Sequence, residues 1–353
     1  MTNPYEGLPP KAYWRTAVAE PGAFGLSGLW QPKFPVRPRD SIATAGSCFA
    51  QHIGRALAGR GYGWTDFEPA PPFLKGEEAR RFGYGVFSFR TGNIYTPGML
   101  LQWLQIAFGD LPQPPETWER EGRFFDPLRP AIEPDGFASE TELMEARAAT
   151  CSAIRAAVTG ADLFVFTLGL TESWFNAESG LEYALCPGTV AGRFEARSHQ
   201  FRNANSRLTY RNMRAAINFM QRQNPGLRVL LTVSPVPLTA TASGQHVLTA
   251  TTYSKSILRG AAGMLADEMA AVDYFPSYEI ITSPLSRGMF YGANMRSVLP
   301  EGVETVMGHF FGAQQAAFGV PKKGRGRRPA QSDRPAITDD VACEEEMLDA
   351  FAS

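Results

Sequence analysis

Cysteine and histidine are scarce in this sequence. The 353 residues include four histidines and four cysteines (Cys48, Cys151, Cys186 and Cys343), with no Cys-x-x-Cys pair among them. Zinc sites and disulfide frameworks need cysteines in regular numbers and at short spacings. The sequence therefore predicts neither a metal site nor a disulfide-stabilised fold.

A surplus of charge and a long apolar run are also missing. The 34 Lys and Arg residues are balanced by 35 Asp and Glu residues, so the formal net charge is −1, which argues against electrostatic steering toward nucleic acid. Apolar runs fall short of the roughly 18 residues of a membrane span, and the first residues lack the charged and apolar regions of a signal peptide. We expect no nucleic-acid partner, no membrane span and a cytoplasmic location.

The chain does contain short apolar segments alternating with helical ones. With 44% hydrophobic residues, it can build the core of one α/β domain. Buried strands are predicted at residues 41–45, 162–168 and 227–233, and the last two follow predicted helices at 140–160 and 209–223. This alternation favours a parallel sheet with helices on both faces.

Hydroxyl side chains follow each predicted strand: Ser47, Thr171 and Ser234. Ligands of parallel α/β sheets bind outside the carboxyl ends of the strands. We therefore expect these three residues to meet at one pocket.

The segment 41–54 carries the strongest chemical signal. Its strand passes through the small turn Gly46-Ser47-Cys48 into a predicted helix at 51–60. Such a turn can expose a nucleophile beside the free N–H groups of a helix N-terminus, which hold the oxyanion formed during acyl transfer. Two other interpretations stay open: Ser47 simply caps the helix, or Cys48, a better nucleophile intrinsically, does the chemistry.

Several ordered motifs resemble those of one family. They are Gly46-Ser47-Cys48-Phe49-Ala50, the Arg90–Thr96 and Phe166–Glu172 blocks, Val233–Pro237, Ser254-Lys255-Ser256 and Tyr274–Glu279. Together they resemble the GSCFA family, regarded as a branch of the SGNH (GDSL-like) hydrolases. The resemblance implies a three-layer α/β/α fold with a parallel sheet, of the flavodoxin-like type.

The resemblance also implies a function. It suggests a serine esterase or O-acyltransferase acting on an O-acyl group, plausibly acetyl on a carbohydrate or another small molecule, through an acyl-Ser47 intermediate and without metal or organic cofactor. Ser47 would be the nucleophile and Cys48 would turn into the core. The oxyanion hole would comprise Ser47, Gly92, Asn93 and Thr171, and Glu172 and Ser234 would contact substrate.

The general base departs from the family pattern. SGNH hydrolases usually end with Asp-x-x-His, whereas here the corresponding residues are Asn294-Met295-Arg296-Ser297. Of the four histidines, His246 is the best replacement because it follows the strand ending near Ser234; His52 and His199 come next, and His309 is interpreted as a packing residue. If no histidine serves, the alternative is an inactive SGNH-fold protein that binds glycans or acts as a scaffold.

Three regions are expected along the chain. Residues 1–40 are interpreted as an aromatic and Pro-rich arm wrapped on the core, 41–315 as the GSCFA domain, and 316–353 as a basic flexible linker with a short C-terminal helix that docks back. Lys255, inside the domain, is expected to cap its helix or face solvent, with contact to a substrate carboxylate as the alternative.

Overall fold

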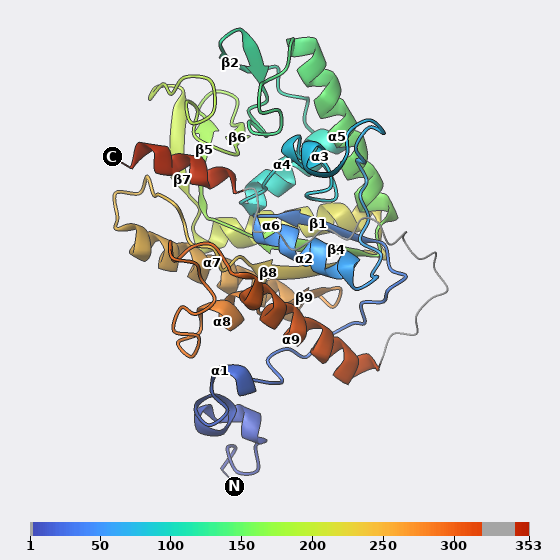
Figure 1. Cartoon of the computed structure of the whole chain (residues 1–353), viewed down its shortest axis with the longest axis vertical. Coiled ribbons are helices and arrows are strands. Elements are labelled where there is room, and N and C mark those ends of the chain that lie inside the picture. Colours follow the sequence, from blue (N-terminus) through green and yellow to red (C-terminus); the bar gives the residue numbers. More distant parts are fainter. Residues whose placement is uncertain (1–2, 320–342, 353) are drawn as a thin grey trace.

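A four-stranded parallel sheet forms the centre of the molecule. The computed structural model describes residues 3–319 and 343–352. The sheet has the strand order β1-β4-β8-β9 (Figure 1), with all three pairings parallel. Its strands are β1 (Ile42–Gly46), β4 (Leu163–Leu168), β8 (Arg228–Val233) and β9 (Val272–Tyr274).

Alternate residues of each strand pack into two separate cores. Phe164 and Phe166 of β4 face the cluster built with α4 (Pro97–Phe108), α5 (Glu140–Gly160), α6 (Ser206–Gln223) and α7 (Val247–Glu268). Leu163 and Val165 face the cluster built with α2 (Phe49–Gly59), α8 (Ser277–Thr282) and α9 (Pro300–Phe318). Because side chains alternate across a strand, this pattern confirms the predicted three-layer α/β/α fold.

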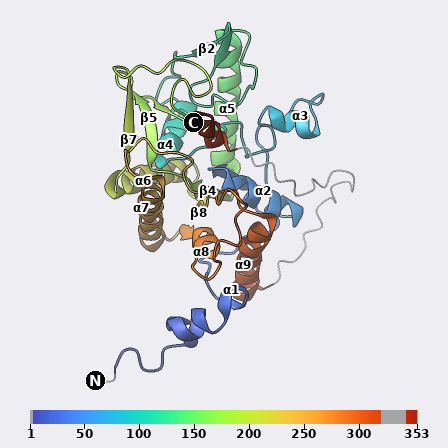
Figure 2. The same ribbon diagram turned by 60° about the vertical axis from the view of Figure 1, so that its left-hand side comes forward.

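Smaller elements were not anticipated from the sequence. A three-stranded antiparallel sheet, ordered β6-β5-β7, contains β5 (Glu172–Asn176), β6 (Glu182–Tyr183) and β7 (His199–Asn203). The predicted irregular stretches contain α3 (Gly76–Arg81) and the hairpin of β2 (Trp118–Arg120) and β3 (Arg123–Phe125). By contrast, the short C-terminal helix that the sequence predicts is present as a 3-10 helix, η3 (Glu344–Phe351), which lies beside the small sheet (Figures 1 and 2).

The N-terminal segment follows the expectation only in part. Trp30, Phe34 and Val36 are buried in the cluster with α9. Trp14 and Phe24, however, are 68% and 84% exposed, and η1 (Pro10–Ala12), η2 (Arg15–Ala19) and α1 (Gly22–Gly25) extend away from the sheet (Figure 2). The prediction that the whole arm wraps on the core is therefore wrong for this stretch.

The basic residues of the predicted linker, Lys322, Lys323, Arg325, Arg327 and Arg328, lie outside the described residues.

A buried ion-pair network braces the segment before α4. The Asp126 carboxylate accepts hydrogen bonds from Arg129 (2.9 Å) and Arg147 (2.8 Å), and all three side chains are fully buried. Arg129 also donates to the backbone carbonyl of Arg90 (2.7 Å). Burying two guanidinium groups without their carboxylate would cost folding free energy. Asp126 therefore fixes the chain where it approaches residues 91–95.

We predict that Asp126→Ala destabilises the protein by about 3–5 kcal/mol, because it leaves Arg129 and Arg147 buried without their counter-ion. Chemical denaturation measures this loss. The matched control is Asp135→Ala, which removes the partner of Arg81 in an exposed pair and should change stability by less than about 1 kcal/mol. Equal effects of the two substitutions would contradict the bracing role.

Candidate active site

The turn between β1 and α2 is shaped by Gly46. Its φ is 127°, and a Cβ at this position would lie 2.3 Å from the Thr167 carbonyl oxygen, so only glycine fits. The Ser47 N–H donates to that same carbonyl (2.9 Å) and extends the β1–β4 ladder. The N–H that was expected in the oxyanion hole is thus engaged within the sheet, and the chain leaves the sheet only at Cys48.

The Ser47 side chain is packed inward. The residue is 2% exposed, and its Oγ has no hydrogen-bond partner among the described residues. A Cβ placed on Gly169 would lie 2.9 Å from the Ser47 Cβ. Ser47 therefore packs against the turn that follows β4.

The Cys48 thiol lies among titratable side chains. It is hydrogen-bonded with Cys343, and Lys255 and Glu345 act on it electrostatically. The hydrogen bond with Cys343 and the burial of Cys48 raise the pKa of this thiol well above its ordinary value. Cys48 is 4% exposed, so its side chain is buried, as the resemblance implies, and lies beside Cys343 and Lys255.

The Gly92–Tyr95 segment crosses the ends of two strands. The Ile94 N–H donates to the Gly46 carbonyl (2.9 Å), and the Tyr95 carbonyl accepts from the N–H groups of Gly169 and Leu170 (both 3.0 Å). Gly92 has φ 65°, in the left-handed region that glycine favours. The structure therefore brings Gly92 and Asn93 to the turn between β1 and α2 (Gly46-Ser47-Cys48), which we call the elbow.

Two residues of α7 hold the turn after β4. The Lys255 Nζ donates to the Gly169 carbonyl (2.7 Å), and the Ser254 Oγ accepts from the Thr171 N–H (3.0 Å). Lys255 is 1% exposed, so the expectation of a helix cap or a solvent-facing lysine is wrong. Burial lowers the pKa of Lys255 to about 8, a value suited to proton transfer near neutral pH.

The C-terminal segment occupies this site. The Glu344 carboxylate is hydrogen-bonded by both the side chain and the backbone N–H of Asn93. A Cβ on Gly92 would lie 2.5 Å from the Glu344 Oε1. The Glu345 N–H donates to the Tyr95 hydroxyl (3.3 Å). A carboxyl oxygen is thus bound by Asn93, at the end of the sheet that carries the turn between β1 and α2.

A cavity of about 440 Å³ adjoins the segment. It lies between the small sheet, the turn after β4 and η3, and its lining is mostly apolar. The larger apolar side chains that line it are Tyr95, Met99, Leu170, Trp174, Phe194, Phe201, Leu238, Leu348 and Phe351. This lining suits a ligand with an apolar or aromatic face.

The remaining predicted contact residues have other partners. The Thr171 hydroxyl donates to Asn203 Oδ1 (2.7 Å) and so fastens β7, while Ser234 Oγ accepts from the Val236 N–H (3.3 Å). Glu172 lines the cavity and accepts a hydrogen bond from the Thr241 hydroxyl (2.6 Å). Burial raises the pKa of Glu172. Ser47, Thr171 and Ser234 follow strand ends as expected, but none of them lines this cavity, so the expectation that they meet at one pocket is wrong for it; Glu172 does line it.

The three histidines considered as the general base have other local contacts. His246 is exposed, and its Nδ1 accepts from the Leu248 N–H at the start of α7 (3.2 Å). His52 packs on Phe49, and burial lowers its pKa to about 4. His199 accepts from the Glu195 N–H (3.0 Å). His246 and Ser47 are not hydrogen-bonded.

The stretch that replaces Asp-x-x-His faces the C-terminal segment. Asn294 Nδ2 donates to Ser297 Oγ (2.9 Å). Arg296 lies 4.0 Å from the Glu345 carboxylate and 3.9 Å from that of Glu346. A cation therefore lies beside the site in place of the usual histidine.

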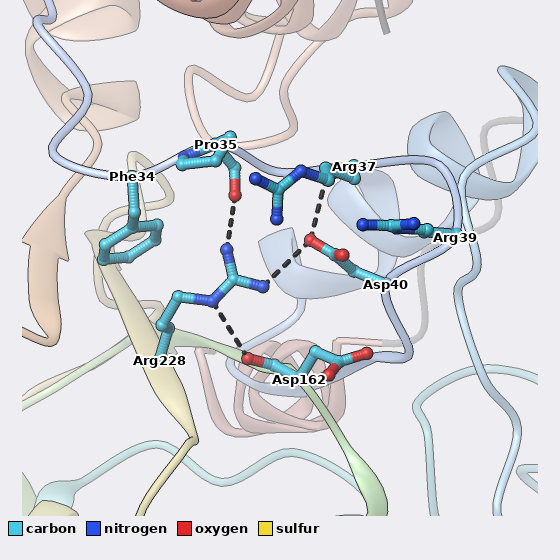
Figure 3. Close-up of a pocket in the computed structure, with 7 residues that line it drawn as sticks. All are labelled: Phe34, Pro35, Arg37, Arg39, Asp40, Asp162 and Arg228. Carbon is cyan, nitrogen blue, oxygen red and sulfur yellow. Dashed lines mark hydrogen bonds and ion pairs between the residues drawn. The ribbon is translucent and has the colours of Figure 1, made fainter. Parts of the chain in front are cut away.

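A second cavity, of about 460 Å³, lies at the opposite edge of the sheet (Figure 3). Arg228, at the start of β8, bonds there to the carboxylate of Asp40 (2.9 Å) and to the carbonyls of Pro35 and Asp162. These contacts tie the N-terminal segment to the sheet. Because ligands of parallel sheets bind at the carboxyl ends, we assign this cavity a structural role.

The fold is that of an α/β protein with a cavity at the carboxyl edge of its parallel sheet. Residues 41–310 match the model of the GSCFA family, and the chain belongs to this family. No curated protein and no solved structure matches it. Within the described ranges, no group of three His, Cys, Asp or Glu residues is arranged to hold a metal, and every helix is too short or too polar to cross a bilayer.

We predict that docking of residues 343–352 weakens as pH rises. Burial raises the pKa of Glu344 to about 7, from an ordinary value of 4.5. The protonated acid is thus favoured in the docked state, and docking is strongest below pH 4.5 and falls by up to about tenfold per pH unit as pH approaches 7. Burial also raises the pKa of Glu345 to about 7, against the opposing charges of Arg296 and Lys255.

Hydrogen exchange of the segment across this pH range, corrected for the intrinsic exchange rates, measures the effect. Glu344→Gln should reduce the dependence to the part contributed by Glu345, whereas Glu346→Gln, at an exposed position, should leave it unchanged. Protection that is independent of pH in the wild type would contradict this assignment.

Proposed function

We propose that the protein is an acyl-transfer enzyme, an esterase or O-acyltransferase of SGNH type, in which the acyl group is carried by the elbow between β1 and α2. One observation supports this most: Asn93 donates two hydrogen bonds to a carboxylate beside the elbow. The same donors would accept the oxyanion of a tetrahedral intermediate.

The geometry favours Cys48 over Ser47 as the nucleophile. The Ser47 hydroxyl is buried without a partner and its N–H is used by the sheet. Cys48 lies at the N-cap of α2. Its hydrogen bond with Cys343 and its burial raise the pKa of the thiol, and the charge of Lys255 opposes this rise. A cation and a helix N-terminus both favour the thiolate, which is the reactive form. The serine esterase implied by the family resemblance is the second candidate.

The reaction follows from these positions. The Cys48 thiolate attacks the ester carbonyl, and Asn93 stabilises the oxyanion. The C–O bond then breaks, a thioester forms, and Lys255 gives a proton to the departing alkoxide. Water, or a second hydroxyl in a transferase, attacks the thioester, Lys255 takes up its proton, and the thiolate is released.

The substrate is proposed as an O-acyl ester with an apolar face. The cavity beside the C-terminal segment presents Trp174 and Phe201, and aromatic rings pack well against acyl chains and the apolar faces of sugars. A carbohydrate-linked acyl group, as the resemblance implies, is compatible with this lining.

We predict that Cys48→Ala abolishes acylation by an activated ester such as p-nitrophenyl butyrate, while Ser47→Ala retains it. The adduct is detected by intact-mass analysis after rapid quenching, and the loss in Cys48→Ala should exceed about 1,000-fold, as for other nucleophile deletions. Circular dichroism checks that both variants fold.

The opposite result has a clear meaning. Acylation and fluorophosphonate labelling that are lost only in Ser47→Ala would make the protein a serine esterase. If the wild type is not acylated, with or without residues 343–352, both the Cys48 and the Ser47 mechanism are contradicted. The inactive glycan-binding or scaffolding protein is then favoured.

A further inference from the structure

We propose that the candidate active site is also a binding site for an acidic, amphipathic peptide segment, and that the chain's own residues 343–352 occupy it as a tethered inhibitor. This proposal rests on the proposed location of the active site, but binding of the segment does not require the acyl-transfer chemistry.

The segment enters the site with its acidic residues. Glu344 and Glu345 are each only 7% exposed. Glu344 takes the two hydrogen bonds of Asn93, and the Glu345 N–H is bonded to the Tyr95 hydroxyl. Because Asn93 is also the proposed oxyanion donor, a substrate carbonyl and the Glu344 carboxylate cannot be bound there at once.

Charge complementarity supports the choice of ligand. Arg296 lies 4.0 Å from the Glu345 carboxylate, and Lys255 acts on the same carboxylate. Buried cations need a counter-ion, and Glu345 supplies it. A peptide with an apolar side chain at this position would leave Lys255 and Arg296 without this partner.

Apolar contacts extend the interface beyond the acidic residues. Leu348 and Phe351, three positions apart on η3, both line the cavity that also contains Leu170 and Trp174. Residues three apart share one face of a 3-10 helix. Met347, by contrast, is 41% exposed and is absent from that lining.

Docking also suppresses the reactivity of the elbow. The hydrogen bond with Cys343, the burial of the thiol and the charge of Glu345 raise the pKa of Cys48, whereas Lys255 lowers it. Release of the segment removes the contributions of Cys343 and Glu345 and leaves that of Lys255. The segment thus blocks the acyl position and keeps Cys48 in its unreactive thiol form.

The test is alkylation of Cys48 by iodoacetamide in the full-length protein, followed by peptide mass spectrometry. Leu348→Asp should weaken docking and speed Cys48 alkylation by roughly tenfold or more, since tenfold corresponds to about 1.4 kcal/mol. Met347→Asp, which adds the same charge to the same helix, is the matched control and should leave the rate unchanged. Alkylation of buried Cys151 reports any general unfolding.

A synthetic peptide of residues 343–352, with serine in place of Cys343, completes the experiment. Added to the Leu348→Asp protein, it should restore protection of Cys48, and the same peptide carrying Leu348→Asp should not.

The two proposals fail in distinguishable ways. Equal Cys48 alkylation in wild type, Leu348→Asp and Met347→Asp, with no effect of the peptide, would overturn the tethered inhibitor even if esters acylate Cys48. Faster alkylation in Leu348→Asp, reversed by the peptide, would support the peptide site even if no ester reacts.

Discussion

The site depends on one backbone crossing, in which the Gly92–Tyr95 segment is hydrogen-bonded to the ends of β1 and β4. The bonds from Ile94 to Gly46 and from Gly169 and Leu170 to Tyr95 fix three loops relative to one another. The buried Arg129, which bonds to the Arg90 carbonyl, anchors the segment from the other side. Buried backbone groups need hydrogen-bond partners. These hydrogen bonds therefore fix the elbow, Asn93 and the turn after β4, which accepts a hydrogen bond from Lys255, as one unit.

That unit is strongly suited to binding an anion. Asn93 supplies hydrogen-bond donors, and Lys255 and Arg296 supply positive charge, in a place where the end of a parallel sheet meets the start of α2. The chain fills the site with its own carboxylates, and their burial raises their pKa values to about 7. The same features that would stabilise a developing oxyanion also hold the segment that excludes the substrate.

Local patterns in the sequence were sufficient to predict the parallel sheet and the helices around it. Apolar strands between helices predicted the parallel sheet, and the helix predicted at 140–160 has these limits in the structure. The small sheet was missed because β6 has two residues and its pairing is nonlocal. The orientation of Cys48 depends on Gly46 and Thr167, and the role of Cys343–Phe351 depends on contacts about 250 positions away in the chain. No local pattern encodes such contacts; the only hint was the acidic, amphipathic end of the chain.

The central claim is that the Cys48 thiol faces the active site and that the C-terminal segment lies against it. Mild oxidation of the full-length protein with diamide, followed by non-reducing peptide mapping, tests both parts at once. The account predicts a disulfide between Cys48 and Cys343, formed in preference to any link with Cys151 or Cys186 and slowed by Leu348→Asp. If Cys48 stays a free thiol while Cys343 is oxidised elsewhere or remains reduced, the account is contradicted.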